Sequence, residues 1–155
     1  MDLTQLSQAY AQLVAESEMV PGRPAPGTEW RAEIVLAHVI VNDRVLMGAA
    51  CDLLDGLGAV IDNRSTQSLA YLEAVAGAAQ SWTGLVATVS QSAREVIAVM
   101  ASLGPELFSR PLPTRLIDAG VVQVDRPMSL EELLGIHASF HLPSHIRQLA
   151  TCRQA

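Results

Sequence analysis

One run of apolar residues constrains the fold of this chain more than any other feature. Between Thr66 and Leu103, apolar side chains recur at alternating intervals of three and four residues without a slip. This seven-residue repeat is typical of a helix that buries one stripe, and it favours packing at about +20°, as in four-helix bundles. The sequence therefore predicts an all-α fold whose longest helix covers these residues. The stripe consists of Leu72, Val75, Ala79, Trp82, Val86, Val89, Ala93, Val96 and Met100.

Two further helices are predicted before this one. Residues 2–19 carry a shorter heptad stripe, which predicts an amphipathic helix. The segment 20–27 contains three prolines and two glycines, which cannot continue a helix. Thr28 is a suitable N-cap for a second helix, which we expect to run from about Glu29 to Leu54. Its core-facing stripe contains Ile34, His38, Val41, Val45 and Gly48.

The pattern changes before the last helix. Residues 114–117 and 121–124 are short runs rich in β-branched side chains, and the turn between them contains Gly120. This arrangement predicts a β-hairpin, which must lean on the helices because two strands alone are only marginally stable. Ser129 and Glu132 then form a capping box that opens the fourth helix. The predicted fold is thus a four-helix bundle with a small β-hairpin or irregular insertion before the last helix.

Composition limits the function classes. The 155 residues are half apolar and 17% charged, which predicts one folded domain over residues 1–155. The net charge of −6 and the absence of a basic run argue against a nucleic-acid partner. The N-terminus has no basic segment followed by an apolar one, and no apolar run approaches the ~18–20 residues of a membrane span. We therefore expect a cytoplasmic protein with a small-molecule substrate.

Histidines form the most informative chemical pattern. His137, His141 and His145 are spaced by four residues, which places them on one helix face, and His38 lies on the core-facing stripe of the second helix. A buried imidazole needs a partner for each ring nitrogen. A divalent metal meets that need, because it binds neutral imidazole at ~2.0–2.1 Å, and three protein ligands leave one position open. The alternative is a polar histidine cluster that shares protons and waters.

Two motifs resemble a known family. Trp30-Arg-Ala-Glu33-Ile-Val-Leu-Ala-His38 resembles the tryptophan-initiated second helix of the DinB-like superfamily. The stretch from His141 to Leu149 resembles that family's H-x3-H motif, which is followed by glutamine and an aliphatic residue. The resemblance covers nearly the whole chain. It implies a four-helix bundle in which His38, His141 and His145 hold one divalent metal, commonly zinc or nickel.

The last helix departs from the family pattern at two positions. Pro143 lies between two of the implied ligands, removes the amide that would bond to the carbonyl of Ser139, and predicts a kink or break. His137 offers an alternative or additional ligand, because His137 and His141 both precede the proline. We favour His141 with His145, since the resemblance aligns there, and then expect His137 to lie behind the ligands or in the core.

The resemblance also implies a chemistry. Characterised relatives include transferases that join bacillithiol or mycothiol to an electrophile, and the mycothiol-dependent maleylpyruvate isomerase. We therefore expect a thiol-dependent S-transferase or isomerase, and the lysine-free, alanine-rich composition favours mycothiol as cosubstrate. Bundles of this type frequently dimerise, so a homodimer is also expected. The alternatives are a non-catalytic metal-stabilised bundle that binds or senses a ligand, and a degenerate member that holds no metal.

Four residues near the histidines receive weaker expectations. Glu33 and Asp43 each lie five residues from His38, about half a turn off its helix face, so we expect both carboxylates to be solvated. Arg44 and Arg147 could guide an anionic substrate, although ordinary surface positions are the simpler interpretation.

Overall fold

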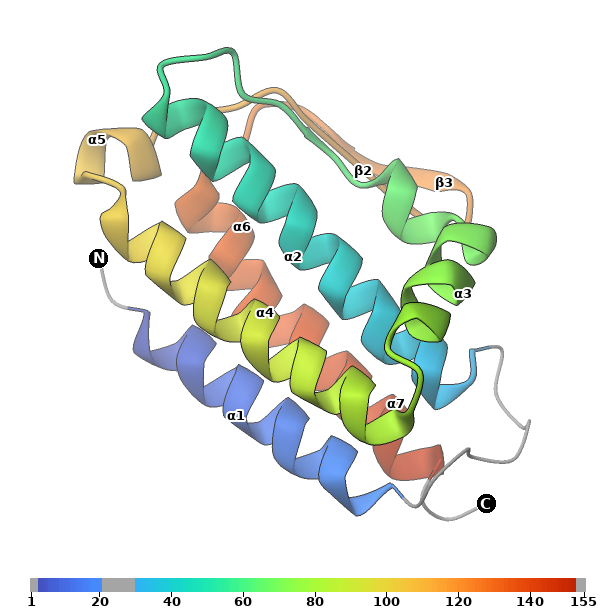
Figure 1. Ribbon diagram of the computed structural model, residues 1–155. Helices are drawn as coiled ribbons and strands as arrows, with labels where there is room; N and C mark the ends of the chain where they lie inside the picture. The colour runs from blue at the N-terminus through green and yellow to red at the C-terminus, as the bar shows by residue number, and fades with distance from the viewer. Residues whose placement is uncertain (1–2, 21–29, 153–155) are drawn as a thin grey trace.

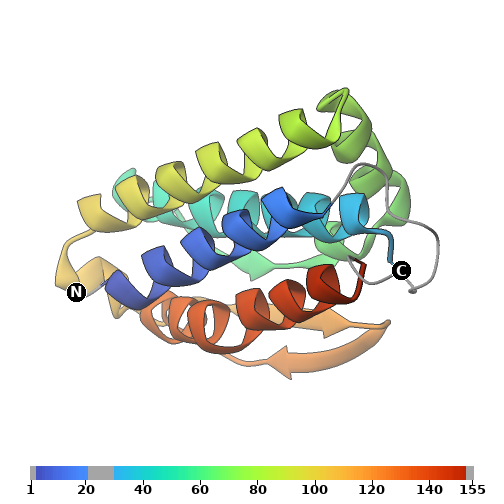
Figure 2. The ribbon, with the colours of Figure 1, turned by 90° about the horizontal axis from the view of Figure 1, so that it is seen from below.

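The computed structural model describes residues 3–20 and 30–152. Within them, helices α1 (Thr4–Met19), α2 (Ala32–Leu54) and α4 (Trp82–Ser102) lie beside one last helical stretch (Figures 1 and 2). That stretch consists of α6 (Leu130–Ile136), η2 (His137–His141) and α7 (Leu142–Cys152). Helices α1 and α2 each contact both α4 and α7, so the four stretches close around one core. The predicted, mostly helical fold is confirmed.

Helix α2 is the most buried element. Its sequence is almost continuously apolar, and its buried side chains lie on nearly every side of the helix axis. By length and composition alone, helix α2 could span a membrane, contrary to the expectation from the sequence. However, 67% of its most apolar 18-residue segment is buried inside the fold. A core helix of this kind passes the same test. The expected N-cap Thr28 and the first expected residue, Glu29, lie outside the described residues.

The prediction of one long third helix is wrong. The expected range divides into the 3₁₀ turn η1 (Arg64–Gln67), α3 (Leu69–Ala78) and α4. Gln80 separates α3 from α4 with a left-handed φ of 61°, which no helix interior contains. Ser81 then caps α4 by accepting a hydrogen bond from the amide of Gly84. A Cβ at Gly84 would collide with the carbonyl oxygen of Ala79, so the close turn requires this glycine.

The predicted hairpin is confirmed and belongs to a larger sheet. Strands β2 (Thr114–Asp118) and β3 (Val121–Asp125) are antiparallel and joined by Ala119 and Gly120, whose φ values are 46° and 78°. Strand β1 (Ile61–Asp62), which was not predicted, pairs in parallel with β2 and gives the order β1-β2-β3. The side chain of Asn63 exchanges two hydrogen bonds with the backbone of Ile117. The hairpin is thereby fixed to the segment that follows α2.

The last helical stretch begins as predicted and then changes geometry. Ser129 and Glu132 form the expected capping box at the start of α6. The short helix α5 (Pro105–Phe108) and an isolated bridge between Leu112 and Met128 precede it. Residues His137–His141 form a π-helical turn, after which α7 continues as a regular α-helix. Pro143 therefore lies in the first turn of α7, where its missing N–H is tolerated.

Candidate metal centre

Helices α2 and α7 and the turn η2 bring three histidines together. His38 projects from α2, His141 ends the π turn, and His145 lies one turn further along α7. His38 and His145 are buried, with 6% and 7% of their surfaces exposed, and His141 is partly buried. One ring nitrogen from each of the three lies within 4.8 Å of the others. The convergence predicted from sequence spacing is therefore present.

The Nε2 atoms face one another. The Nε2 atom of His141 lies 2.9 Å from Nε2 of His38 and 3.1 Å from Nε2 of His145. Three imidazole nitrogens bound to one tetrahedral ion at ~2.0–2.1 Å would lie about 3.3 Å apart. The two separations from His141 are a few tenths of an ångström shorter, so a slight outward movement of the His141 ring would make room for one small ion.

The Nδ1 atoms fix the tautomers of two of these rings. Nδ1 of His38 lies 2.9 Å from the carbonyl oxygen of Thr66, and Nδ1 of His145 lies 2.6 Å from Oε1 of Gln148. Oxygen acceptors at these positions require N–H donors, so both rings carry their hydrogen on Nδ1. Their Nε2 lone pairs therefore point into the centre. This arrangement is typical of metal-binding histidines, whose second nitrogen donates to a nearby oxygen.

His141 cannot satisfy both neighbours with hydrogen bonds. Its Nε2 carries at most one hydrogen, which can reach either His38 or His145 but not both. At least one of the two contacts of about 3 Å is then left without a hydrogen between its nitrogens. The Nδ1 atom of His141 is buried and has no hydrogen-bond partner. A cation at the meeting point of the three Nε2 atoms would remove this conflict, so the donor set fits a divalent metal.

Burial keeps the three imidazoles neutral. Desolvation lowers the pKa of His38 to about 4, with a smaller contribution from His145, although the bond to Thr66 opposes the shift. Desolvation also lowers the pKa of His141 well below its ordinary value and lowers that of His145, where the bond to Gln148 acts in the opposite direction. Neutral imidazole is the form that binds a metal. The centre is therefore ready to bind at neutral pH without first losing protons.

His137 lies outside this triad. The ring is 3% exposed, with Nε2 3.0 Å from the hydroxyl of Tyr10 and Nδ1 3.3 Å from the amide nitrogen of Asn42. Its Nε2 is also 3.5 Å from a carboxylate oxygen of Asp43. Both ring nitrogens thus have protein partners, and His137 is absent from the group of potential ligands. The arrangement favours His141 with His145 over the alternative pair of His137 with His141.

The expectation that Asp43 is solvated is wrong. Its carboxylate is fully buried, with 0% exposed, and accepts hydrogen bonds from Tyr10 at 2.6 Å and Ser92 at 2.7 Å. A position off the His38 face is not a surface position here, because α2 is covered on several sides by α3, α4 and α7. Tyr10 belongs to the heptad stripe of residues 2–19, with Leu3, Leu6 and Leu13; this stripe predicted a core residue but not its polar partner.

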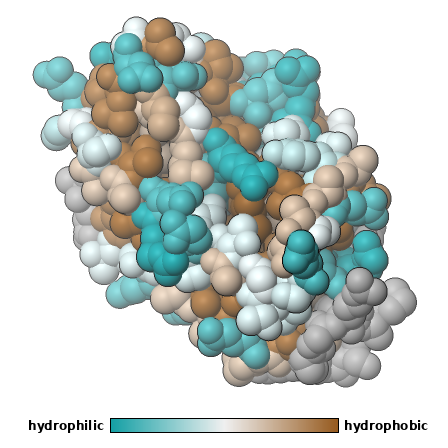
Figure 3. Space-filling view, viewed as in Figure 1, coloured by the Kyte–Doolittle hydropathy of each residue, from teal (hydrophilic) through white to brown (hydrophobic). Residues whose placement is uncertain are grey.

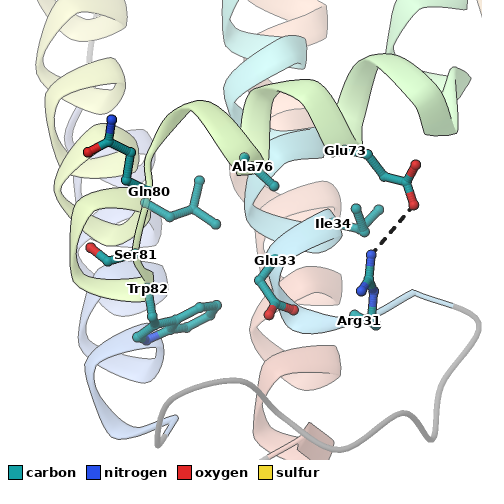
Figure 4. Close-up of a pocket in the computed structure, with 10 residues that line it drawn as sticks. Arg31, Glu33, Ile34, Glu73, Ala76, Gln80, Ser81 and Trp82 are labelled. Atoms are coloured by element: carbon teal, nitrogen blue, oxygen red, sulfur yellow. Dashed lines mark ion pairs between the residues drawn. The ribbon is translucent and has the colours of Figure 1, made fainter.

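The other expected residues lie away from the histidines. Glu33 lines a cavity of about 330 Å³ between α2, α3 and the start of α4, where Trp82 forms one wall (Figure 4). None of the four histidines lines that cavity. Arg44 donates to the hydroxyl of Tyr71 and Arg147 to Ser144, both on the exposed surface. On the face seen in Figure 3, hydrophobic residues are interleaved with hydrophilic ones.

Comparison of the chain with family models, curated proteins and solved structures gave no match.

Proposed function

We propose that this protein binds one divalent metal through His38, His141 and His145. The supporting observation is that His38 and His145 both direct Nε2 lone pairs at His141, because each donates its Nδ1 hydrogen to an oxygen. A histidine cluster without a metal would leave at least one of these lone pairs without a hydrogen-bond donor in a buried site. Zinc and nickel are the metals that the resemblance to the DinB-like superfamily implies, and the closed ring of four helical stretches agrees with its four-helix bundle.

The proposed activity is thiol-dependent transfer or isomerisation of a small molecule. Three histidine ligands leave a coordination position open, and a divalent ion there would hold a bound thiol as the nucleophilic thiolate. The thiol would have to come from a cosubstrate of the mycothiol type. Cys51 is exposed and lies thirteen residues beyond His38, or about 20 Å along α2, and Cys152 lies seven residues beyond His145. Neither cysteine belongs to the triad.

The first experiment is metal analysis of tag-free protein purified without chelator. We expect about one zinc or nickel ion per chain in the wild type and loss of that ion in both His38→Ala and His145→Ala. Ser144→Ala is the matched control, because Ser144 lies beside His145 but does not contribute to the triad. A folded wild-type protein that takes up neither metal after incubation would refute the proposal and favour a polar histidine cluster.

The activity is tested on the metal-loaded protein. We expect consumption of an electrophile in the presence of mycothiol or another low-molecular-weight thiol, and a loss of at least a hundredfold in His145→Ala. Metal without thiol-dependent turnover would instead support the non-catalytic alternative, a bundle that the ion stabilises and that binds or senses a ligand. Sedimentation of the same preparation tests the expected homodimer.

A further inference from the structure

His137 is the one histidine that the proposed centre does not use. Tyr10 donates its hydroxyl hydrogen to Asp43, so the Tyr10 oxygen is free to accept a hydrogen bond from Nε2–H of His137. The Nδ1 atom of His137 then accepts from the side-chain amide of Asn42. One tautomer of His137 satisfies all these contacts, and both ends of its ring are fixed.

The groups that hold His137 are themselves rigid. Asp43 is 0% exposed, and its two oxygens are occupied by Tyr10 and Ser92. Burial and the neighbouring carboxylate raise the pKa of Tyr10 well above its ordinary value, so the hydroxyl keeps the hydrogen that it donates. A buried network with every member satisfied is stiff, because each rotation would break a bond that water cannot replace. The orientation of His137 is therefore determined by side chains from three other helices, α1, α2 and α4, rather than by its own turn.

His141 lacks the support that the other two histidines have. His38 and His145 are oriented by Nδ1–H bonds to oxygen, whereas Nδ1 of His141 has no partner. Its ring instead stacks on His137, with the ring centres 4.8 Å apart and the planes 28° from parallel. The contacts of His141 with His38 and His145 are tilted or edge-on, at 41° and 86°. Stacking on His137 is the contact that restricts rotation of the His141 ring.

We propose that His137 is a positioning residue for the centre. By stacking, it holds the ring of His141 in place. Tyr10, Asp43 and Asn42 in turn hold the ring of His137. The inference rests on the proposed metal-binding function only for its consequence, namely that fixing His141 raises metal affinity. The positioning itself is a property of the metal-free protein. It replaces the hydrogen bond that usually orients a metal-binding histidine.

Three variants separate stacking from simple packing. His137→Phe keeps a flat aromatic face but loses the hydrogen bonds to Tyr10 and Asn42. His137→Leu fills the space without a flat face. Tyr10→Phe removes the hydroxyl that bonds to His137. Circular dichroism and urea unfolding first establish that each variant is folded. A purely structural role predicts that Phe and Leu at position 137 behave alike, whereas positioning by stacking predicts that they differ.

The first readout uses the metal-free protein, in which the ring of His141 is followed by ¹⁵N–¹H nuclear magnetic resonance. We expect one narrow set of signals in the wild type, little change in His137→Phe, and broadened or doubled signals in His137→Leu. The second readout is affinity for Zn²⁺ by competition with a chelator. We expect a loss of about tenfold in His137→Leu, a smaller loss in Tyr10→Phe, and partial rescue in His137→Phe.

The absorption spectrum of bound Co²⁺ completes the test, because it changes when a histidine ligand rotates. A His137→Leu variant with wild-type His141 signals, Zn²⁺ affinity and Co²⁺ spectrum would overturn the inference while leaving the metal site intact. A wild-type protein that binds no metal would refute the proposed function instead. The ring signals of His141 would then still decide whether His137 positions it.

Discussion

At the level of single residues, the position of one hydrogen on each imidazole determines what the centre can bind. His38 is oriented by the main-chain carbonyl of Thr66, which no substitution can remove, whereas His145 is oriented by the side chain of Gln148. Gln148 is exposed and belongs to the last part of α7, so it can be changed with little effect on the core. A substitution of Gln148 therefore tests how much the fixed tautomer of His145 contributes to metal affinity.

We expect Gln148→Met to weaken metal binding by about tenfold, because Nδ1 of His145 loses its oxygen acceptor and the ring can place its hydrogen on Nε2. Gln148→Glu, which keeps an acceptor at the same position, should bind at least as tightly as the wild type. Chelator competition measures both affinities, and urea unfolding should show a change of less than ~0.5 kcal/mol, as for most exposed substitutions. Equal affinities for the two variants would show that Gln148 does not control the tautomer.

The sequence allowed the convergence of these histidines to be predicted but not the residues behind them. Spacing by four residues, together with a core-facing His38, was sufficient to predict that rings from two helices meet. The burial of Asp43 was not accessible in the same way, because its helix position predicts a surface residue unless the neighbouring helices are known to cover that side. Its partners Tyr10 and Ser92 come from two other helices.

At the level of elements, the π turn explains how three histidines in one stretch can share a face. Four residues of an ideal α-helix turn about 40° beyond a full circle, so three histidines spaced by four would drift by about 80°. The wider π turn from His137 to His141 falls short of a full circle by about 30°. The α-helical step from His141 to His145 then restores the direction. The two deviations nearly cancel, and the imidazoles stay aligned.

Pro143 is the sequence feature that accompanies this turn. A proline at this position has no N–H to give to Ser139 and disfavours α geometry in the turn before it. The amide of Leu142 bonds instead to the carbonyl of His137, five residues earlier. The sequence predicted a kink or break at this proline. In the structure the helix continues with one widened turn, and His141 and His145 remain together.

We expect Pro143→Ala to relax the π turn towards α geometry, because an N–H becomes available to Ser139. His141 would then rotate relative to His145, and the Zn²⁺ affinity should fall by about tenfold, while the midpoint of thermal unfolding of the metal-free protein stays level or rises. Ser144→Ala, the neighbouring substitution that leaves the proline in place, should change neither property. Wild-type affinity in Pro143→Ala would indicate that packing against α1 and α2, rather than the proline, sets the turn.

The third helix shows a second limit of sequence pattern at this level. The heptad stripe correctly predicted that Leu72, Val75 and Val86 are buried. It did not predict continuity, because α3 turns away at Gln80 and still buries its stripe against α2. Ser81 as an N-cap and Gly84 at the close turn were the local signals for a break. A repeat that fits a single helix can thus be shared by two helices packed on the same core.

At the level of the whole molecule, one buried carboxylate links all the long helical stretches. Asp43 belongs to α2, Tyr10 to α1, Ser92 to α4 and His137 to the turn before α7. Apolar packing alone would allow these helices to slide or rotate at small cost, whereas the network is satisfied in one arrangement only. Such a network fixes the register of α2 against the last stretch, and this register determines whether His38 meets His141 and His145.

Stability of the whole chain should depend on pH through the same centre. His38 has a pKa of about 4 in the folded protein, and an ordinary histidine has one near 6.5 when the chain is unfolded. Between these values the unfolded state binds more protons than the folded state, so the free energy of unfolding falls as the pH falls. Above the unfolded-state pKa of about 6.5, the contribution of His38 to the free energy of unfolding is fully present. Below the folded-state pKa of about 4, no further stability is lost from this residue. The lowered pKa values of His141 and His145 act in the same direction.

We therefore expect the metal-free protein to lose roughly 2 kcal/mol of unfolding free energy between pH 7 and pH 5 from His38 alone. Urea unfolding at intervals across this range measures the slope, and the range avoids most carboxylate titration. His38→Asn removes the titrating ring, so its slope should be shallower by that amount even if its stability at pH 7 is lower. Parallel slopes for the two proteins would mean that His38 titrates normally in the folded state. The Nε2 atom of His38 would then carry a proton at mildly acidic pH, where protons would compete with a metal ion for this ring.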